Sequence, residues 1–129
     1  MASDGSETIL VAEDQESIRV LIRGFLEQRG YRVLTAQDGL EAISLLNDYP
    51  QSIDLLVTDV LLPGIDGGGI VKLSLERRPK IQVLYITGFG EEMIPDATAA
   101  FLLKPFRLEE LACKIRTALD NNRSTSREL

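Results

Sequence analysis

Acidic, hydroxyl and amino side chains stand at the ends of four short apolar stretches of this sequence. Glu13 and Asp14 end the run ILVAED, and Asp59 ends LLVTD. Thr87 ends YIT, and Lys104 directly follows FLL. If these ends meet, three carboxylates would repel one another, and a bound divalent cation would remove the conflict. Hard oxygen ligands that leave room for water and a phosphate favour Mg²⁺ over zinc or copper.

The same residue types suit phosphoryl transfer. Beside a bound cation, Asp59 could act as a nucleophile toward a phosphoryl group and form an aspartyl-phosphate. The metal and Lys104 would stabilise charge on the transferring oxygens, and the Thr87 hydroxyl could bind one of them. Taken singly, each position has a simpler interpretation as a helix cap, a turn, a strand end or a solvated lysine. Their occurrence at four successive strand ends favours one shared site.

Apolar stretches alternate with amphipathic ones along the chain, which predicts alternating strands and helices. The predicted strands are Thr8–Ala12, Arg32–Ala36, Ile53–Thr58, Ile81–Thr87 and Ala100–Leu103. The predicted helices are Ser17–Arg29 with Gly30 as its stop, Asp38–Tyr49 opened by the capping box Asp38-x-x-Glu41, Ile70–Arg77, and a last helix with an apolar face from Leu108 to Leu119.

Strands that are apolar on both faces indicate a parallel sheet covered by helices on both sides, which is an α/β fold. Right-handed crossovers favour a doubly wound, flavodoxin-like (βα)5 arrangement with strand order 2-1-3-4-5. Ligands of such sheets bind beyond the carboxyl ends of the strands, between strands 1 and 3. The polar strand ends lie at that edge.

Two segments depart from this regular pattern. Only 16 residues separate Thr87 from Lys104, and Pro95 interrupts them, so we expect the fourth helix to be short or absent. Gly67, Gly68 and Gly69 open the third helix, and we expect that turn to fray because glycine is a poor helix former. A phosphate-binding glycine loop would need a flanking lysine-serine pair, which is missing here.

The chain length of 129 residues and its 44% of apolar residues indicate one domain. We expect this domain over residues 8–121, with residues 1–7 as a disordered tail or an added leader and residues 122–129 as a C-terminal tail. The single cysteine, Cys113, lies in an apolar-periodic stretch and is expected to be a buried thiol in a reducing compartment. No apolar run approaches the ~20 residues of a membrane span, so we expect a cytoplasmic protein without membrane contacts.

The net charge of −6, from 20 acidic and 14 basic residues, argues against nucleic acid as a partner. The chain contains no histidine, which excludes histidine-based acid–base catalysis, phosphohistidine chemistry and histidine-ligated metals within the chain itself. A protein that binds cations or other proteins fits this composition.

Four segments resemble the receiver domains of two-component signalling. They are the acidic pair in ILVAEDQ, the aspartate in VTDVLLPGIDG, the threonine in YITG and the lysine-proline pair in FLLKPF, and the similarity extends over about residues 8 to 120. The resemblance implies that Asp59 accepts a phosphoryl group from a phosphohistidine on a sensor histidine kinase or a histidine phosphotransfer protein.

The resemblance also implies the metal ligands. Asp14 and Asp59 would bind Mg²⁺ through their side chains. Glu13 would do so mostly through water, and Leu61 through its backbone carbonyl. Leu61 and Phe89 match family positions that flank the phosphate, and we expect these apolar side chains to hinder an in-line water and lengthen the phosphoryl lifetime.

The switch residues follow from the same resemblance. Thr87 would move toward the phosphate, Lys104 would pair with it, and Phe101, at the aromatic switch position, would follow Thr87. The Lys104–Pro105 peptide bond would be cis.

The expected function is therefore a phosphoacceptor receiver that switches protein–protein interactions and is not a stand-alone turnover enzyme. The segments ETILVAED, LLVTDVLLPGIDG and FLLKPF resemble receivers attached to hybrid sensor histidine kinases, and we expect no DNA binding by this chain itself. Homodimer formation is left open.

The alternative is a degenerate receiver that binds proteins without phosphorylation. A flavin-binding electron carrier would need a Ser/Thr/Gly-rich phosphate loop where AEDQES stands, and an aspartyl-phosphate hydrolase would need its nucleophile after strand 1.

Overall fold

Five parallel strands form a single sheet in the order β2-β1-β3-β4-β5, as predicted. The computed structural model describes residues 5–60, 67–88 and 100–128, with 67, 68 and 121–128 described by their backbone alone. The strands are β1 (Thr8–Ala12), β2 (Arg32–Ala36), β3 (Leu55–Asp59), β4 (Gln82–Thr87) and β5 (Ala100–Leu103).

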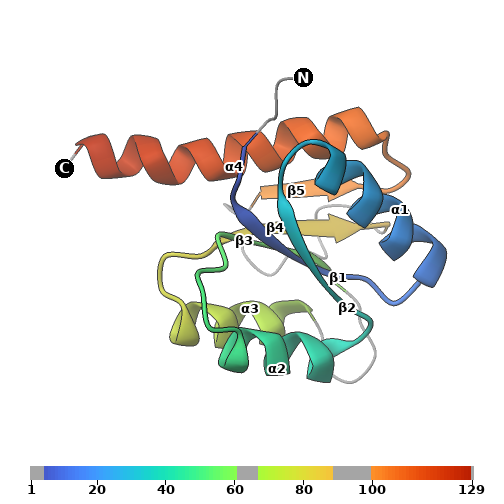
Figure 1. Ribbon diagram of the computed structural model, residues 1–129, viewed down its shortest axis with the longest axis horizontal. Helices are drawn as coiled ribbons and strands as arrows, with labels where there is room; N and C mark the ends of the chain where they lie inside the picture. Colours follow the sequence, from blue (N-terminus) through green and yellow to red (C-terminus); the bar gives the residue numbers. More distant parts are fainter. Residues whose placement is uncertain (1–4, 61–66, 89–99, 129) are drawn as a thin grey trace.

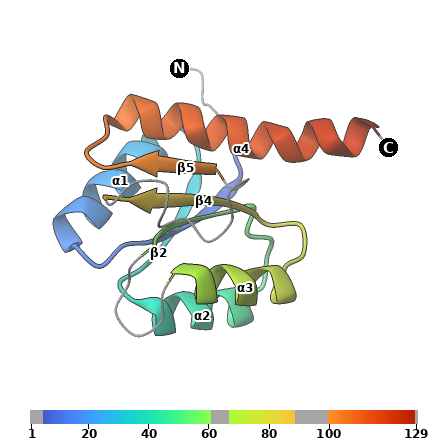
Figure 2. The ribbon, with the colours of Figure 1, turned by 180° about the vertical axis from the view of Figure 1, so that it is seen from behind.

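Two helices cover each face of the sheet (Figure 1). Helices α1 (Glu16–Gln28) and α4 (Leu108–Glu128) lie on one face, and α2 (Gly39–Asp48) and α3 (Gly67–Arg77) lie on the other. The view from behind shows the same two layers (Figure 2). This is the doubly wound architecture that the alternating pattern predicts.

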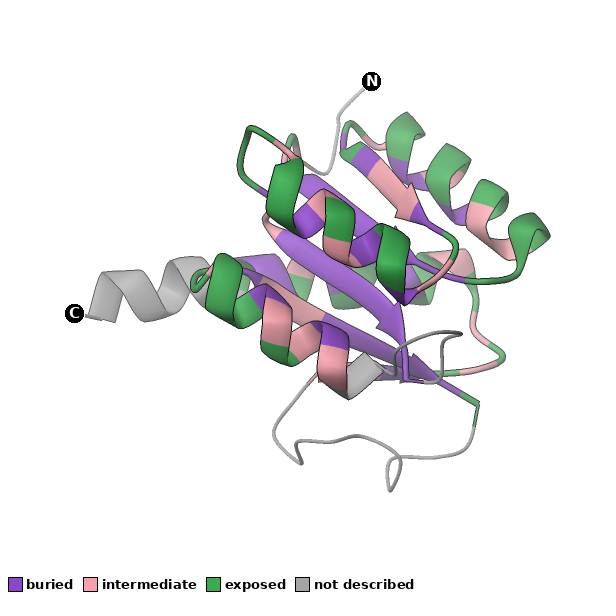
Figure 3. Ribbon diagram, turned by 90° about the horizontal axis from the view of Figure 1, so that it is seen from below, coloured by how far each residue is buried: buried purple, intermediate pink, exposed green. Residues whose placement is uncertain are grey.

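Side-chain alternation along the strands supplies an apolar core to each face. Ile9 and Val11 of β1 point into the cluster beneath α1 and α4, whereas Leu10 and Ala12 point into the cluster beneath α2 and α3. The central strands β1 and β3 are buried along their whole length, the edge strands β2 and β5 are only partly buried, and the outer faces of the helices are exposed (Figure 3). Burial of each large aliphatic side chain contributes about 1.5–3 kcal/mol, so both helix layers are held mainly by apolar contacts.

The register of the strands fixes which residues share the carboxyl edge. Ala12 lies beside Thr58 across the β1–β3 pair, so the next residue along each chain segment, Glu13 and Asp59, lies at the same level of the carboxyl edge. Asp59 in turn lies beside Ile86 of β4. The sheet therefore brings the acidic residues together before any side-chain contact is considered.

Helix boundaries agree with the predicted caps. The Asp38 side chain accepts a hydrogen bond from the Glu41 backbone N–H at 2.8 Å, and the Glu41 carboxylate accepts one from the Gln37 N–H at 2.8 Å. This reciprocal arrangement confirms a capping box at the start of α2. Gly30, after α1, has φ of 100°, a conformation that glycine adopts without strain.

The end of α2 is held by an arginine from the end of α3. The Arg78 guanidinium donates to the backbone carbonyls of Leu46 at 3.0 Å, Tyr49 at 2.7 Å and Gln51 at 2.8 Å. The last carbonyls of a helix have no partner within the helix, and a cation is favourable at that end. Arg78 therefore connects the two helices of this layer.

The prediction of a buried Cys113 is wrong, because Cys113 is exposed. The buried residues of α4 are Leu111, Ala112, Ile115, Ala118 and Leu119, and position 113 falls on the opposite, outer side at 100° per residue. The apolar face predicted for this helix is confirmed, and the cysteine lies on the side opposite to it.

Several expectations concern segment ends. Helix α4 continues to Glu128, so residues 122–128, expected as a tail, are helical. Helix α3 begins at Gly67 and contains all three glycines, and the fraying expected there stays a prediction. The expectation of a short or absent fourth helix falls on residues 89–99, outside the described residues. In the described ranges, no helix has both the length and the apolar character needed to span a bilayer.

Candidate functional site

Three acidic side chains and one lysine converge at the carboxyl edge of the sheet. Glu13 and Asp14 lie in the loop after β1, Asp59 is the last residue of β3, and Lys104 follows β5. One carboxylate oxygen from each of Glu13, Asp14 and Asp59 lies within 4.8 Å of the other two. The strand order predicts this meeting, since β1 and β3 are neighbours in the middle of the sheet.

Lys104 is paired with the central aspartate. Its Nζ lies 3.0 Å from Asp59 Oδ1 and 3.2 Å from Asp59 Oδ2, and 3.6 Å from Glu13 Oε1. The Lys104 backbone N–H donates to the Thr87 carbonyl at 2.8 Å, which fixes the start of the loop after β5. The Lys104–Pro105 peptide bond is cis, as the family resemblance implies.

Glu13 is a buried carboxylate that lacks full solvation. Only 2% of the residue is exposed; its Oε2 accepts from the Gln15 N–H at 3.0 Å, and its Oε1 has no hydrogen-bond partner within the described parts of the chain. The pKa of Glu13 is raised to about 7, chiefly by burial and also by the nearby Asp59, while the Gln15 hydrogen bond and Lys104 oppose the shift. The site therefore holds more negative charge than its surroundings neutralise.

The same charges act on the lysine. Burial alone would lower the pKa of Lys104, but its hydrogen bond and proximity to Asp59, with the charge of Glu13, outweigh burial and raise the pKa. Lys104 therefore stays an ammonium group at neutral pH and partly balances the two carboxylates.

Asp14, Asp59 and Lys104 line a pocket of about 160 Å³ at the edge of the sheet. Asp14 is exposed at its mouth, whereas Asp59 and Thr87 are buried, with 6% and 2% of each residue exposed. The pocket is lined by Asp14, Asp59, Val60, Ile86, Thr87, Gly88 and Lys104. A volume of this size admits a small ion with a tetrahedral anion.

A second, apolar groove adjoins this pocket. It has a volume of about 540 Å³ and lies between α1 and the segment after β5. We call it the α1 groove; it is lined by Ile18, Leu21, Ile22, Gly88, Lys104, Pro105, Phe106 and Leu108. Gly88 and Lys104 line both cavities, so the groove and the pocket are adjacent.

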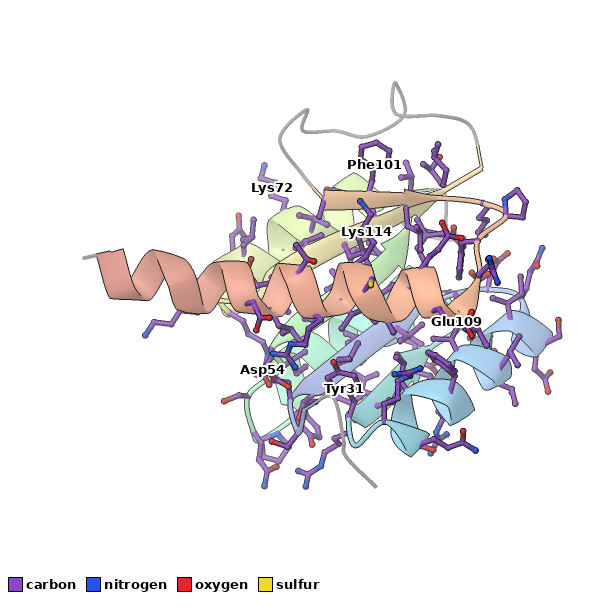
Figure 4. The ribbon with its side chains drawn as sticks, turned by 90° about the horizontal axis from the view of Figure 1, so that it is seen from above. Tyr31, Asp54, Lys72, Phe101, Glu109 and Lys114 are labelled. Carbon is purple, nitrogen blue, oxygen red and sulfur yellow. The ribbon has the colours of Figure 1, made fainter. Side chains whose placement is uncertain are left out.

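Of the residues predicted for the site, Glu13, Asp14, Asp59, Thr87 and Lys104 are brought to one place. Phe101 does not line the pocket. It lies on β5, on the side of the strand away from α4 (Figure 4), half-buried and beside Tyr85 in the neighbouring strand. Leu61, the predicted carbonyl ligand, and Phe89 lie outside the described residues.

One contact of the acidic loop was not predicted. The Arg19 Nη1 of α1 donates to the Glu13 carbonyl at 2.8 Å and lies 3.4 Å from the Asp14 carbonyl. The arginine side chain donates to backbone carbonyls, which every residue has, so no pattern of residue types predicts the contact. The position of Arg19 one turn into the first helix is the only signal that the sequence offers.

The carboxylates and the lysine lie at the switch point of a doubly wound parallel sheet, which is where ligands of such α/β domains bind. The chain belongs to the response regulator receiver domain family, whose model matches residues 9–116. It is thus a receiver domain of two-component signalling, and its fold is the flavodoxin-like fold of such domains.

Individual relatives agree with this assignment. The chain is 31% identical to the sensor kinase CckA of Brucella abortus, over 90% of this chain and 13% of the kinase. It is 34% identical to the response regulator receiver protein CpdR of the same organism, over 86% of this chain and 95% of that protein. A crystal structure of the receiver domain from hybrid histidine kinase CckA has a TM-score of 0.77 at 34% identity, covering 87% of this chain and 98% of that one. The chain thus spans a small part of the kinase and nearly all of the receiver proteins.

Proposed function

We propose that this domain accepts a phosphoryl group on Asp59 and thereby changes its affinity for protein partners. The observation that carries the proposal is the meeting of three carboxylates, with Asp59 paired to Lys104 at 3.0 Å in a pocket that also contains Thr87. An aspartate at the centre of such a cluster is suited to attack phosphorus, because a lysine can balance the charge of the transferred oxygens.

The donor atoms of the pocket suit Mg²⁺. All three acidic side chains offer carboxylate oxygens, and Glu13 Oε1 is a buried oxygen without a hydrogen-bond partner in the described structure, which is the kind of atom that a hydrated cation would satisfy. Asp14 and Asp59 would hold the ion through their side chains, and Glu13 would hold it mostly through water. The proposed Leu61 carbonyl ligand belongs to the undescribed part of the site. When bound, Mg²⁺ would neutralise charge on the phosphoryl oxygens.

Three residues of the pocket, Asp59, Lys104 and Thr87, have separate roles in the proposed reaction. An Asp59 carboxylate oxygen attacks the phosphorus atom, the bond to the donor nitrogen breaks, and the electron pair leaves with that nitrogen. Lys104, already paired with Asp59, holds an oxygen of the transferred group, and the Thr87 hydroxyl donates to another. No histidine is present in these 129 residues, so a phosphohistidine donor must lie outside them.

The switch uses the strand that carries Phe101. Thr87 and Leu103 are register neighbours on β4 and β5, and Phe101 lies two residues before Leu103 on the same face. Movement of Thr87 toward a bound phosphate would change the packing at that end of β5, and the half-buried Phe101 ring would move with it. The surface around β5 would then differ between the two states, which is the change that a partner would read.

The α1 groove offers the place where the phosphodonor would dock. Leu21 is 57% exposed at its rim, and Gly88 and Lys104 connect the groove to the Asp59 pocket. A helical histidine kinase or phosphotransfer protein could rest an apolar surface there while its phosphohistidine reaches Asp59. Leu21→Lys should slow transfer from a kinase that phosphorylates the wild type and leave phosphorylation by phosphoramidate unchanged, because the small donor needs no docking. Leu40→Lys, on α2 and 70% exposed, is the matched control.

The proposal is tested with beryllofluoride, which mimics an aspartyl-phosphate. Added with Mg²⁺ to the wild type, it should shift the amide resonances of Asp59, Thr87 and Phe101 and raise the melting temperature. Asp59→Asn should abolish the response, and Asp48→Asn, an exposed aspartate at the end of α2, should retain it. If wild type and Asp59→Asn respond alike, or neither responds, the alternative of a receiver that binds proteins without phosphorylation is favoured.

A further inference from the structure

The loop that carries the acidic pair is held by a single residue of α1. Three consecutive backbone carbonyls, those of Glu13, Asp14 and Gln15, all face Arg19. Its Nη1 lies 2.8 Å from the Glu13 oxygen and 3.4 Å from the Asp14 oxygen, and its backbone N–H donates to the Gln15 oxygen at 2.9 Å. A loop whose successive carbonyls share one donor residue has little freedom to rotate its peptide planes.

Two further hydrogen bonds hold the loop. The Glu13 N–H donates to the Ala36 carbonyl at 3.0 Å, which fixes the start of the loop against β2. The Gln15 N–H donates to the Glu13 carboxylate at 3.0 Å. The Gln15 contact also restrains the Asp14 carbonyl, because both belong to one peptide group, but neither contact restrains the peptide between Glu13 and Asp14, and Asp14 is exposed. The Arg19 side chain is therefore the contact that reaches both peptides bearing the carboxylates.

Arg19 leaves the carboxylates themselves available. Among the residues that the structure describes, it makes no ion pair with Glu13 or Asp14, although it carries a positive charge near them. A guanidinium directed to backbone oxygens orients the loop without competing with a cation for its ligands. This separates the role of Arg19 from that of Lys104, which contacts the carboxylates directly.

We propose that Arg19 is a positioning residue for the metal-binding pair, and that it sets the Mg²⁺ affinity of the pocket by holding the peptides of Glu13 and Asp14. The inference rests on the proposed Mg²⁺ site. Outer contacts that orient metal ligands contribute about 10- to 100-fold to metal affinity in well-characterised sites. Since Asp14 is exposed and restrained only through its backbone, the lower part of that range applies.

The sign of the effect distinguishes positioning from simple electrostatics. The positive charge of Arg19 repels a cation, so removing it would, by electrostatics alone, strengthen Mg²⁺ binding to the three carboxylates. Loss of the backbone restraint would weaken it. Arg19→Ala therefore gives opposite results for the two roles, and a role confined to the stability of α1 would lower the melting temperature without changing the Mg²⁺ dissociation constant of the folded protein.

The experiment titrates MgCl₂ into ¹⁵N-labelled protein and follows the amide shifts of Asp14, Gln15 and Asp59. We expect the dissociation constant of Arg19→Ala to rise about tenfold over the wild type. Arg23→Ala is the matched control, since it removes the same charge from the same helix at an exposed position that pairs with Glu27. It should bind Mg²⁺ as the wild type does.

Arg19→Lys keeps the charge and shortens the reach, so we expect its dissociation constant to fall between those of the wild type and Arg19→Ala. If Arg19→Ala does not fold, Arg19→Lys decides the question. Mg²⁺ binding as tight as that of the wild type, or tighter, in the deciding variant overturns the inference. Absence of Mg²⁺ binding in the wild type overturns the proposed metal site instead, so the two failures can be told apart.

Discussion

Replacing Glu13 by glutamine should stabilise the metal-free protein at high pH and have little effect in mild acid. The pKa of Glu13 is raised to about 7 chiefly by burial, from an ordinary value of 4.5. A carboxyl group with a higher pKa in the folded state holds its proton more tightly when folded than when unfolded. The free energy of unfolding therefore falls as pH rises from about 4.5 through about 7.

The size of the effect follows from that pKa difference. At about 1.4 kcal/mol per pKa unit, ionising Glu13 above pH 7 costs the folded state roughly 3 kcal/mol. Glutamine keeps the side-chain size and can still accept from the Gln15 N–H. The charged hydrogen bond from Gln15 and the attraction to Lys104 at 3.6 Å already lower the pKa of Glu13, so their loss in the variant is included in the roughly 3 kcal/mol. The variant should therefore be about 3 kcal/mol more stable than the wild type at pH 8.

Urea denaturation in the presence of EDTA measures this difference at about pH 5 and about pH 8. Glu16→Gln, at an exposed glutamate of α1, is the control and should show no pH-dependent gain. Excess Mg²⁺ at pH 8 should reduce the advantage of Glu13→Gln, because only the wild type retains all three carboxylates. A stability difference that is the same at both pH values, or a wild type that is more stable at pH 8, would refute the reasoning.

Three further changes test other parts of the structure. Arg78→Ala should lower the free energy of unfolding by about 2 kcal/mol, because three carbonyls at and after the end of α2 lose a charged donor. The control Arg77→Ala, at the exposed neighbouring residue, should change the free energy of unfolding by less than about 0.5 kcal/mol in the same urea titration. Glu7→Gln should flatten the loss of stability in acid. The Arg116 hydrogen bond lowers the pKa of Glu7, so its contribution exists above pH ~4.5 and disappears as pH falls through the lower folded value; equal slopes of melting temperature against pH in both proteins would contradict this. Leu61→Asn should speed the loss of phosphate from the phosphorylated protein, and equal or slower loss in the variant argues against apolar shielding of the phosphoryl group.

The sequence predicts the strands well because their signal is local. β1, β2 and β5 begin and end where the apolar runs do, and β3 ends one residue later than predicted, at Asp59. An aspartate has low strand propensity, but its backbone pairs with β4 and only its side chain leaves the sheet, so the ladder continues through it. The convergence of the site follows from the same strand order.

Other features depend on three-dimensional contacts that no local pattern encodes. An apolar-periodic stretch contains residues on both sides of its stripe, and Cys113 falls on the outer one. Glu13 Oε1 lacks a hydrogen-bond partner in the described structure, and Arg19 donates to a loop carbonyl. Both features depend on the position of the end of a long side chain once α1 has packed on the sheet. The residue types at the strand ends identify the side chains of the pocket, whereas the hydrogen bonds that each atom makes are seen only in the folded structure.

The order in which a ribosome delivers these elements has a consequence for the nascent chain. Leu111, Ile115, Ala118 and Leu119 of α4 complete the apolar cluster beneath α1 and α4. All five strands leave the exit tunnel before this helix, so one side of the new sheet meets water, or a chaperone, until the last helix arrives. A stop codon placed before Leu111 should therefore yield an aggregating product and not a smaller working domain.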